Sequence, residues 1–116
     1  MSAHHEIFAT ADGAGVPAAI ERVIGVDGRV EGSSGGEVHY TVGFDNAFVD
    51  VALSHDYDDD QGIEFSGFPL VLTVRDRESS QQQEEATARR IFQALRATGL
   101  FHAFLVYNLQ QKLDQF

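Results

Sequence analysis

A dense group of carboxylates near the middle of the chain is the strongest candidate for chemistry. Four aspartates, Asp56, Asp58, Asp59 and Asp60, fall within five consecutive positions of a chain whose formal net charge is -10. Such a cluster repels itself, so it persists where water, a cation or a basic partner screens the charge. The residue types therefore leave three interpretations open: a cation site, a contact for basic groups of a partner, or a solvated loop.

The spacing of these aspartates does not follow the calcium-loop pattern. Asp56, Asp58 and Asp60 alternate, as the first ligands of an EF-hand loop do, but that loop needs Gly at its sixth position and Glu at its twelfth. Counted from Asp56, these positions hold Gln61 and Gly67. The sequence therefore predicts no dedicated metal site.

Two glycine-rich segments match catalytic or nucleotide-binding motifs in their residue types but not in the expected structure around them. Residues 32–36 match the G-x-S-x-G nucleophile elbow, but a strand-like segment follows where a helix is required. Residues 13–18 match G-x-G-x-x-A, but the pattern after them is antiparallel and the chain is too short for a two-half dinucleotide fold. We therefore predict no catalytic residue and no cofactor.

The histidines and the other acidic pairs give weaker signals. The histidines are His4, His5, His39, His55 and His102. No pair of them has the spacing of a helical zinc motif, so we interpret them as surface residues. The alternative is that His39 and His55 lie on adjacent strands and pair with an aspartate as a metal or acid–base site.

Glu84 and Glu85 fall in the first turns of a predicted helix, where acidic side chains favour the helix dipole. We expect no carboxylate in an apolar pocket, and Glu64 is the nearest candidate for one.

The elements that position these residues follow from periodicity. A strand is expected over residues 6–11, and Pro17 then begins a helix that Gly25 ends. Residues 32–36 read as a flexible loop. Alternating apolar positions predict strands over 38–44 and 49–53, with a new strand beginning near Ile63 and Phe65, and 70–74 read as a central strand.

The last third of the chain predicts a helix and then a strand. The helix begins at Ser79 or Ser80, with a capping-box spacing to Gln83, and Gly99 ends it. Residues 101–107 read as a buried strand, with a helix continuing to Leu109 as the alternative. The tail is expected to cover one side of the sheet.

We expect an α+β fold in a single domain spanning residues 1–116. Its antiparallel sheet has four to five strands, and two or three helices pack mainly on one face. With 116 residues and no cysteine, such a chain needs neither disulfide nor metal to fold. No signal peptide or membrane-length apolar run is visible, which favours the cytoplasm.

The charge balance narrows the possible partners. The chain has 18 acidic residues against 8 basic ones, and a nucleic-acid binder would place lysines and arginines against phosphates. We therefore expect no nucleic acid, no membrane and a basic protein partner. The oligomeric state stays open.

Phe48 is out of phase with the apolar positions 49, 51 and 53, which predicts that it lies on the opposite face of the sheet. Aromatic anchors beside an acidic rim are typical of protein-binding sites. The predicted partner-binding residues are Phe48, Asp56, Tyr57, Asp58, Asp59 and Asp60.

The sequence thus predicts a non-catalytic protein-binding domain, such as an inhibitor, an immunity-type protein or a chaperone. The alternative is a small enzyme or small-molecule-binding domain that uses a pocket between sheet and helix, with His55 and nearby aspartates.

Overall fold

The structure is a computed structural model that describes residues 4–11, 16–25, 30–34, 37–44, 46–53, 55, 57–59 and 62–116. The strands are β1 (His5–Thr10), β2 (Val30–Ser34), β3 (Glu37–Phe44), β4 (Ala47–Ala52), β5 (Leu70–Asp76), β6 (His102–Tyr107) and β7 (Gln111–Gln115). The helices are α1 (Val16–Ile24), the 3-10 turn η1 (Phe65–Gly67) and α2 (Gln81–Thr98).

All the described strands join one antiparallel sheet in the order β2-β3-β4-β5-β1-β6-β7. β5 lies at its centre, between β4 and β1, as the apolar run at 70–74 predicts. The α+β class and the antiparallel sheet are therefore confirmed.

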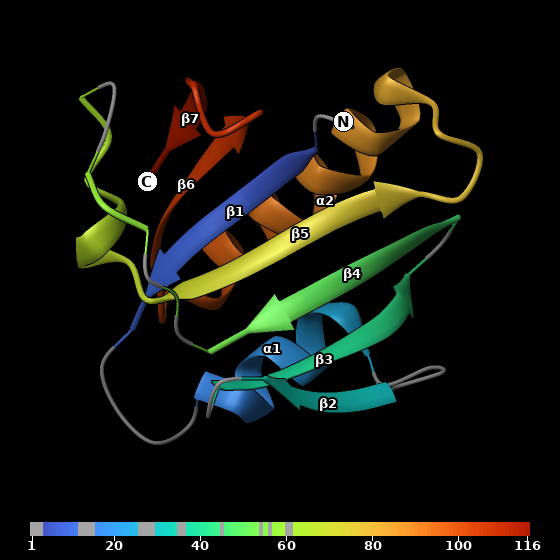
Figure 1. The fold of residues 1–116 in the computed structure, drawn as a ribbon, viewed down its shortest axis with the longest axis horizontal. Coiled ribbons are helices and arrows are strands. Elements are labelled where there is room, and N and C mark those ends of the chain that lie inside the picture. Colours follow the sequence, from blue (N-terminus) through green and yellow to red (C-terminus); the bar gives the residue numbers. More distant parts are fainter. Residues whose placement is uncertain are drawn as a thin grey trace.

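Both α-helices pack on the same face of this sheet (Figure 1). Strand alternation explains why, since Leu72 and Val74 of β5 are fully buried in the core that also contains Ile91 of α2. Thr73 and Arg75, between and beyond them, point to the other face. We call that other face, which carries no α-helix among the described residues, the open face.

The ends of α2 follow the sequence signals. The Ser80 hydroxyl accepts a hydrogen bond from the Gln83 N–H, and Gly99 ends the helix with φ 69°. The second half of the predicted capping box is replaced, because the Ser80 N–H donates to the Asp76 carboxylate at 3.0 Å instead. The end of β5 thus holds the start of α2.

One end of the open face is covered by a second, smaller core. Phe8, Phe65 and Phe104 lie in it with ring centroids 4.8 to 5.8 Å apart. The expected strand at Ile63 and Phe65 is wrong. The segment after Gly62, which has φ 73°, forms the 3-10 turn η1, and both apolar side chains pack into this aromatic cluster.

The predicted number of strands is too low, since the described residues alone form a sheet of seven strands where four or five were expected. β2 takes residues 32–34 from the predicted flexible loop and pairs them with β3. β7 comes from the tail, where Leu113 and Phe116 pack against the main core while its polar residues remain at the surface. The alternative helix at the end of the chain is wrong, because β6 is a strand.

Candidate functional site

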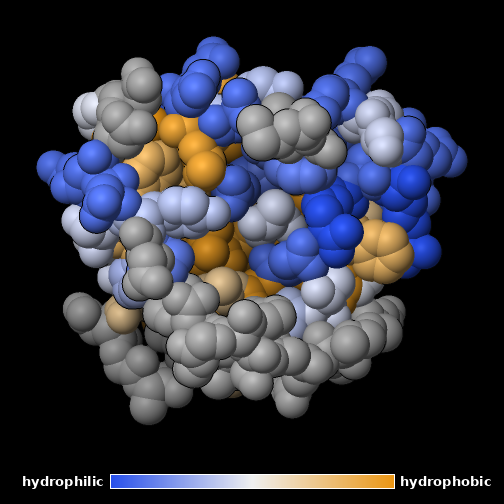
Figure 2. All heavy atoms as spheres, viewed as in Figure 1, coloured by the Kyte–Doolittle hydropathy of each residue, from blue (hydrophilic) through white to orange (hydrophobic). Residues whose placement is uncertain are grey.

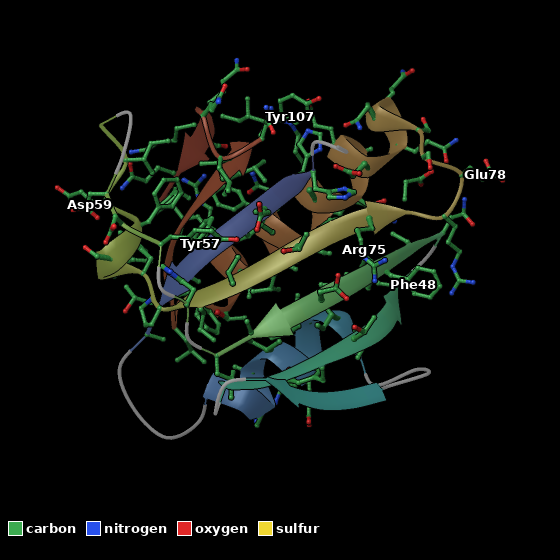
Figure 3. All side chains as sticks on the ribbon, in the orientation of Figure 1. Phe48, Tyr57, Asp59, Arg75, Glu78 and Tyr107 are labelled. Atoms are coloured by element: carbon green, nitrogen blue, oxygen red, sulfur yellow. The ribbon has the colours of Figure 1, made fainter. Side chains whose placement is uncertain are left out.

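The predicted acidic loop connects β4 to β5. Asp56 and Asp60 lie outside the residues that the structure describes. Tyr57, Asp58 and Asp59 are exposed, and Figure 3 shows Tyr57 over the sheet and Asp59 at the edge of the molecule.

His55 fixes the beginning of this loop through both of its ring nitrogens. Its Nδ1 accepts from the Tyr57 N–H at 3.1 Å, and its Nε2 lies 2.6 Å from the Phe68 carbonyl oxygen, to which it donates. The ring is thus the neutral tautomer with its proton on Nε2. Because both ring nitrogens are hydrogen-bonded to the backbone, the His55 imidazole is already used in holding the loop.

Asp59 fixes the loop further along. Its Oδ1 accepts from the Ser66 N–H at 2.9 Å and from the Ser66 hydroxyl at 2.8 Å. These two bonds, the backbone one first, hold the pKa of Asp59 below its ordinary value. One of the predicted partner-binding carboxylates therefore also tethers the loop to η1.

Tyr57 rests on the aromatic cluster of the open face. Its ring centroid lies 5.7 Å from that of Phe8 and 6.1 Å from that of Phe65, and the residue is 42% exposed. An aromatic ring that is fixed from below and exposed above can serve as a contact for another molecule.

Phe48 lies on the open face, as its phase predicts, but far along the sheet from the acidic loop. Figure 3 shows Phe48 and Asp59 at opposite sides of the molecule. The guanidinium groups of Arg77 and Arg75 lie 4.3 and 5.6 Å from its ring centroid, and the residue is 37% exposed. The structure therefore does not bring Phe48 together with the aspartates, and its neighbours are basic.

Between these two ends runs a row of polar side chains. Thr41, Asp50, Thr73 and Glu6 occupy successive register positions across β3, β4, β5 and β1. Arg75 donates to both Asp50 oxygens, at 2.7 and 2.9 Å. In Figure 2 the coloured residues of this face are mostly hydrophilic, with separate hydrophobic patches among them.

Glu6 is the unusual member of this row because it is buried, with 8% of its surface exposed. Burial raises its pKa above the ordinary value, although the hydrogen bond from the Thr73 hydroxyl at 3.0 Å acts in the opposite direction. The sequence named Glu64 as the nearest candidate for a carboxylate in an apolar pocket, but Glu64 is exposed and Glu6 is buried instead.

A second carboxylate is buried on the helix-covered side, where Glu84 is 2% exposed. Its Oε1 accepts from the His5 backbone N–H and from the His5 Nδ1, both at 2.7 Å. Its Oε2 lies 3.3 Å from the His4 Nδ1. This buried cluster joins the start of β1 to the first turns of α2. His5 is itself 2% exposed, so its interpretation as a surface histidine is wrong.

A pocket of about 410 Å³ opens beside this cluster. His5, Glu85, Tyr107, Leu113 and three glutamine side chains line it. The His5 Nε2 lies 3.5 Å from the Glu85 Oε1, and the His5 and Tyr107 ring centroids are 4.8 Å apart. Arg89 donates to the other Glu85 oxygen at 3.0 Å and holds the pKa of Glu85 below its ordinary value.

Sequence reasoning missed this cluster, but a signal for it exists. Glu84 lies four, seven and eleven positions before Ala88, Ile91 and Leu95, which are buried on one face of α2. An acidic residue in phase with an apolar stripe is buried, and a buried carboxylate needs donors.

No group of three or more metal-ligating side chains is placed to hold a metal ion within the described part of the chain. Within that part, no helix is long and apolar enough to cross a membrane. The chain matches no protein-family profile, no curated protein and no solved structure.

Proposed function

We propose that this protein binds a basic protein partner, without catalysis, through the acidic loop and the exposed ring of Tyr57. The observation that carries the proposal is the pairing of an exposed aromatic with exposed aspartates on a fixed base. Tyr57 is held by Phe8 and Phe65 below it, while Asp58 and Asp59 stand exposed beside it. A rigid aromatic loses little entropy on binding, and neighbouring charge steers a partner of opposite sign.

The predicted contact also includes Asp56 and Asp60, which add charge to the loop, and Phe48. In this proposal Phe48 is a second contact, at the far end of the open face, where Arg75 and Arg77 flank it. The partner therefore presents basic groups to the loop and an apolar or acidic group to Phe48. An inhibitor, immunity-type protein or cytoplasmic chaperone would use such a surface.

The polar row between these two contacts supports binding at the ends of the face. Asp50 is neutralised by two bonds from Arg75, and Glu6 is buried and bonded to Thr73. Carboxylates that are buried or paired with a cation offer little charge to another protein, so the energy of contact comes from the exposed Tyr57 ring and the exposed loop carboxylates.

The proposal is tested by capturing partners from a lysate of the source cells, identifying them and measuring their association with purified protein. We expect the triple variant Tyr57→Ala/Asp58→Asn/Asp59→Asn to lose association rate by about tenfold or more at low salt. The matched control Glu78→Gln/Asp114→Asn removes two acidic groups elsewhere. Equal rates for the triple variant and wild type, or equal losses in variant and control, overturn the proposal.

A further inference from the structure

The hydrogen bonds of His5 determine which of its nitrogens carries a proton. Glu84 Oε1 is a carboxylate oxygen that lies 2.7 Å from the His5 Nδ1. A carboxylate can only accept, so Nδ1 is the donor. In the neutral imidazole Nε2 is then an acceptor, and it is the ring nitrogen next to Glu85 in the pocket.

In that neutral form the contact between His5 and Glu85 brings two acceptors together. The distance from Nε2 to the Glu85 Oε1 is 3.5 Å. A second proton on the ring would make a charge-assisted bond, which is typically about 2.7–2.9 Å long, as the bond to Glu84 is. The 3.5 Å distance is longer than such a bond, and both atoms border the pocket, where a group with N–H donors can reach them.

The walls of the pocket indicate the charge and shape of that group. The Glu85 carboxylate lines the pocket and the Glu84 carboxylate lies behind His5, whereas the one guanidinium nearby, that of Arg89, is outside the lining and paired with Glu85, so the local balance of charge favours a cation. The Tyr107 ring adds an aromatic wall, which attracts cations over its face, and Leu113 adds an apolar surface for an alkyl chain. Glutamine side chains supply further acceptors.

We propose that this pocket binds a small organic cation, a guanidinium or primary ammonium group on a short alkyl chain. The cation donates N–H bonds to the His5 Nε2 and the Glu85 carboxylate, and its alkyl chain lies against Tyr107 and Leu113. The volume of about 410 Å³ falls in the ~300–1,000 Å³ range of small-molecule sites. None of the described acidic-loop residues lines the pocket, so this site is independent of the partner-binding proposal.

The same chemistry can come from a free small molecule or from an arginine or lysine side chain of another protein. The experiment therefore uses three probes with the full chain: butylguanidinium, the tripeptide Gly-Arg-Gly with blocked ends, and butyramide as the neutral control. Binding is followed through the ¹⁵N signals of the His5 ring in ¹⁵N-histidine-labelled protein and by calorimetry. We expect a cationic probe to shift the Nε2 signal with a Kd of about 1 mM or tighter.

Variants separate the pocket from general attraction to an acidic protein. We expect Glu85→Gln and Tyr107→Leu each to weaken cation binding by about tenfold. The matched control is Glu78→Gln, an exposed carboxylate near the start of α2 that does not line the pocket (Figure 3). Circular dichroism checks that each variant is folded.

Each outcome decides the proposal. Binding of butylguanidinium but not of the peptide supports a free small molecule as the ligand, and binding of the peptide supports a side chain of another protein. The proposal is overturned if neither cation shifts the His5 signal, which leaves water as the donor. It is also overturned if butyramide binds equally well, if Glu78→Gln weakens binding as much as Glu85→Gln, or if Nε2 carries a proton in the unliganded protein at neutral pH.

Discussion

Replacement of Glu84 tests how the buried cluster stabilises the fold. Both buried bonds, from the His5 backbone N–H and from its Nδ1, end on the same oxygen, Oε1. The Oε2 atom faces the His4 Nδ1 at 3.3 Å, and the His4 side chain is 31% exposed, so water can replace that contact. Loss of the bonds to Oε1 should therefore lower the free energy of unfolding more than loss of the contact to Oε2.

In Glu84→Ala both buried donors of His5 lose their acceptor. A buried unsatisfied group costs about 1–3 kcal/mol, so two of them lower the free energy of unfolding by about 2–6 kcal/mol. In Glu84→Gln the amide oxygen takes the place of Oε1 and keeps both bonds, while the NH₂ faces the exposed His4. Only the charge assistance is lost, and we expect a loss of about 1 kcal/mol or less.

Urea titration measures the free energy of unfolding of both variants. Far-ultraviolet circular dichroism is the probe, because the chain has no tryptophan for fluorescence. The matched control, Glu85→Gln, changes a carboxylate that is 43% exposed and should have little effect on stability. If Glu84→Gln is as destabilising as Glu84→Ala, the cluster depends on a buried ion pair with a charged histidine. That result would refute the assignment of the bonds to Oε1 and of His5 as neutral.

Three further predictions concern the helix cap, the polar row and the loop. Ser80→Ala removes the acceptor for the Gln83 N–H and should lower the free energy of unfolding by about 1 kcal/mol in urea titrations; an unchanged midpoint contradicts this. Glu6, whose pKa is raised by burial, contributes stability that is fully present below its ordinary value of 4.5 and lost as pH rises through the folded pKa. Glu6→Gln should therefore gain stability relative to wild type between pH 4.5 and 7, and a pH-independent difference contradicts the cause. Asp59 has a lowered pKa, so its contribution is present above 3.8 and lost as pH falls. Asp59→Asn should speed hydrogen exchange at the Ser66 amide, and equal protection contradicts the tether.

Local signals in the sequence were sufficient for the elements with strong chemistry of their own. The cap at Ser80 and the left-handed Gly99 were predictable because a side chain or a missing Cβ determines them within a few residues. β5 was predictable from its apolar residues Leu70, Val71 and Leu72, which face the main core on one side and the aromatic cluster on the other.

The edge strands β2 and β7 were not predictable, because they carry no such local signal. β2 is rich in glycine and serine and β7 is mostly polar, so neither shows a period-two pattern. Their strand conformation comes from backbone pairing with β3 and β6, which no local pattern records. The count of strands therefore failed at both edges of the sheet.

Some features of the candidate site were likewise predictable from local pattern, and others depend on contacts far apart in sequence. The exposure of Tyr57 and Asp58 and the phase of Phe48 follow from composition and alternation. The separation of Phe48 from the loop depends on how the β4–β5 connection folds back over Phe8, which involves contacts far apart in sequence. The burial of Glu84 was readable from its phase on α2, but its partner His5 is 79 positions away.

The positions of the acidic side chains also determine how much of the net charge acts on a partner outside the protein. A formal charge of -10 suggests a strong field, yet Asp50 is neutralised by Arg75. A paired carboxylate adds little to the field outside, so steering of a basic partner depends on the exposed loop. Asp50→Asn should therefore leave the association rate unchanged, whereas Asp58→Asn, with the same change of charge, should slow association at low salt. Equal slopes of rate against salt for the two variants would mean that total charge, and not the loop, attracts the partner.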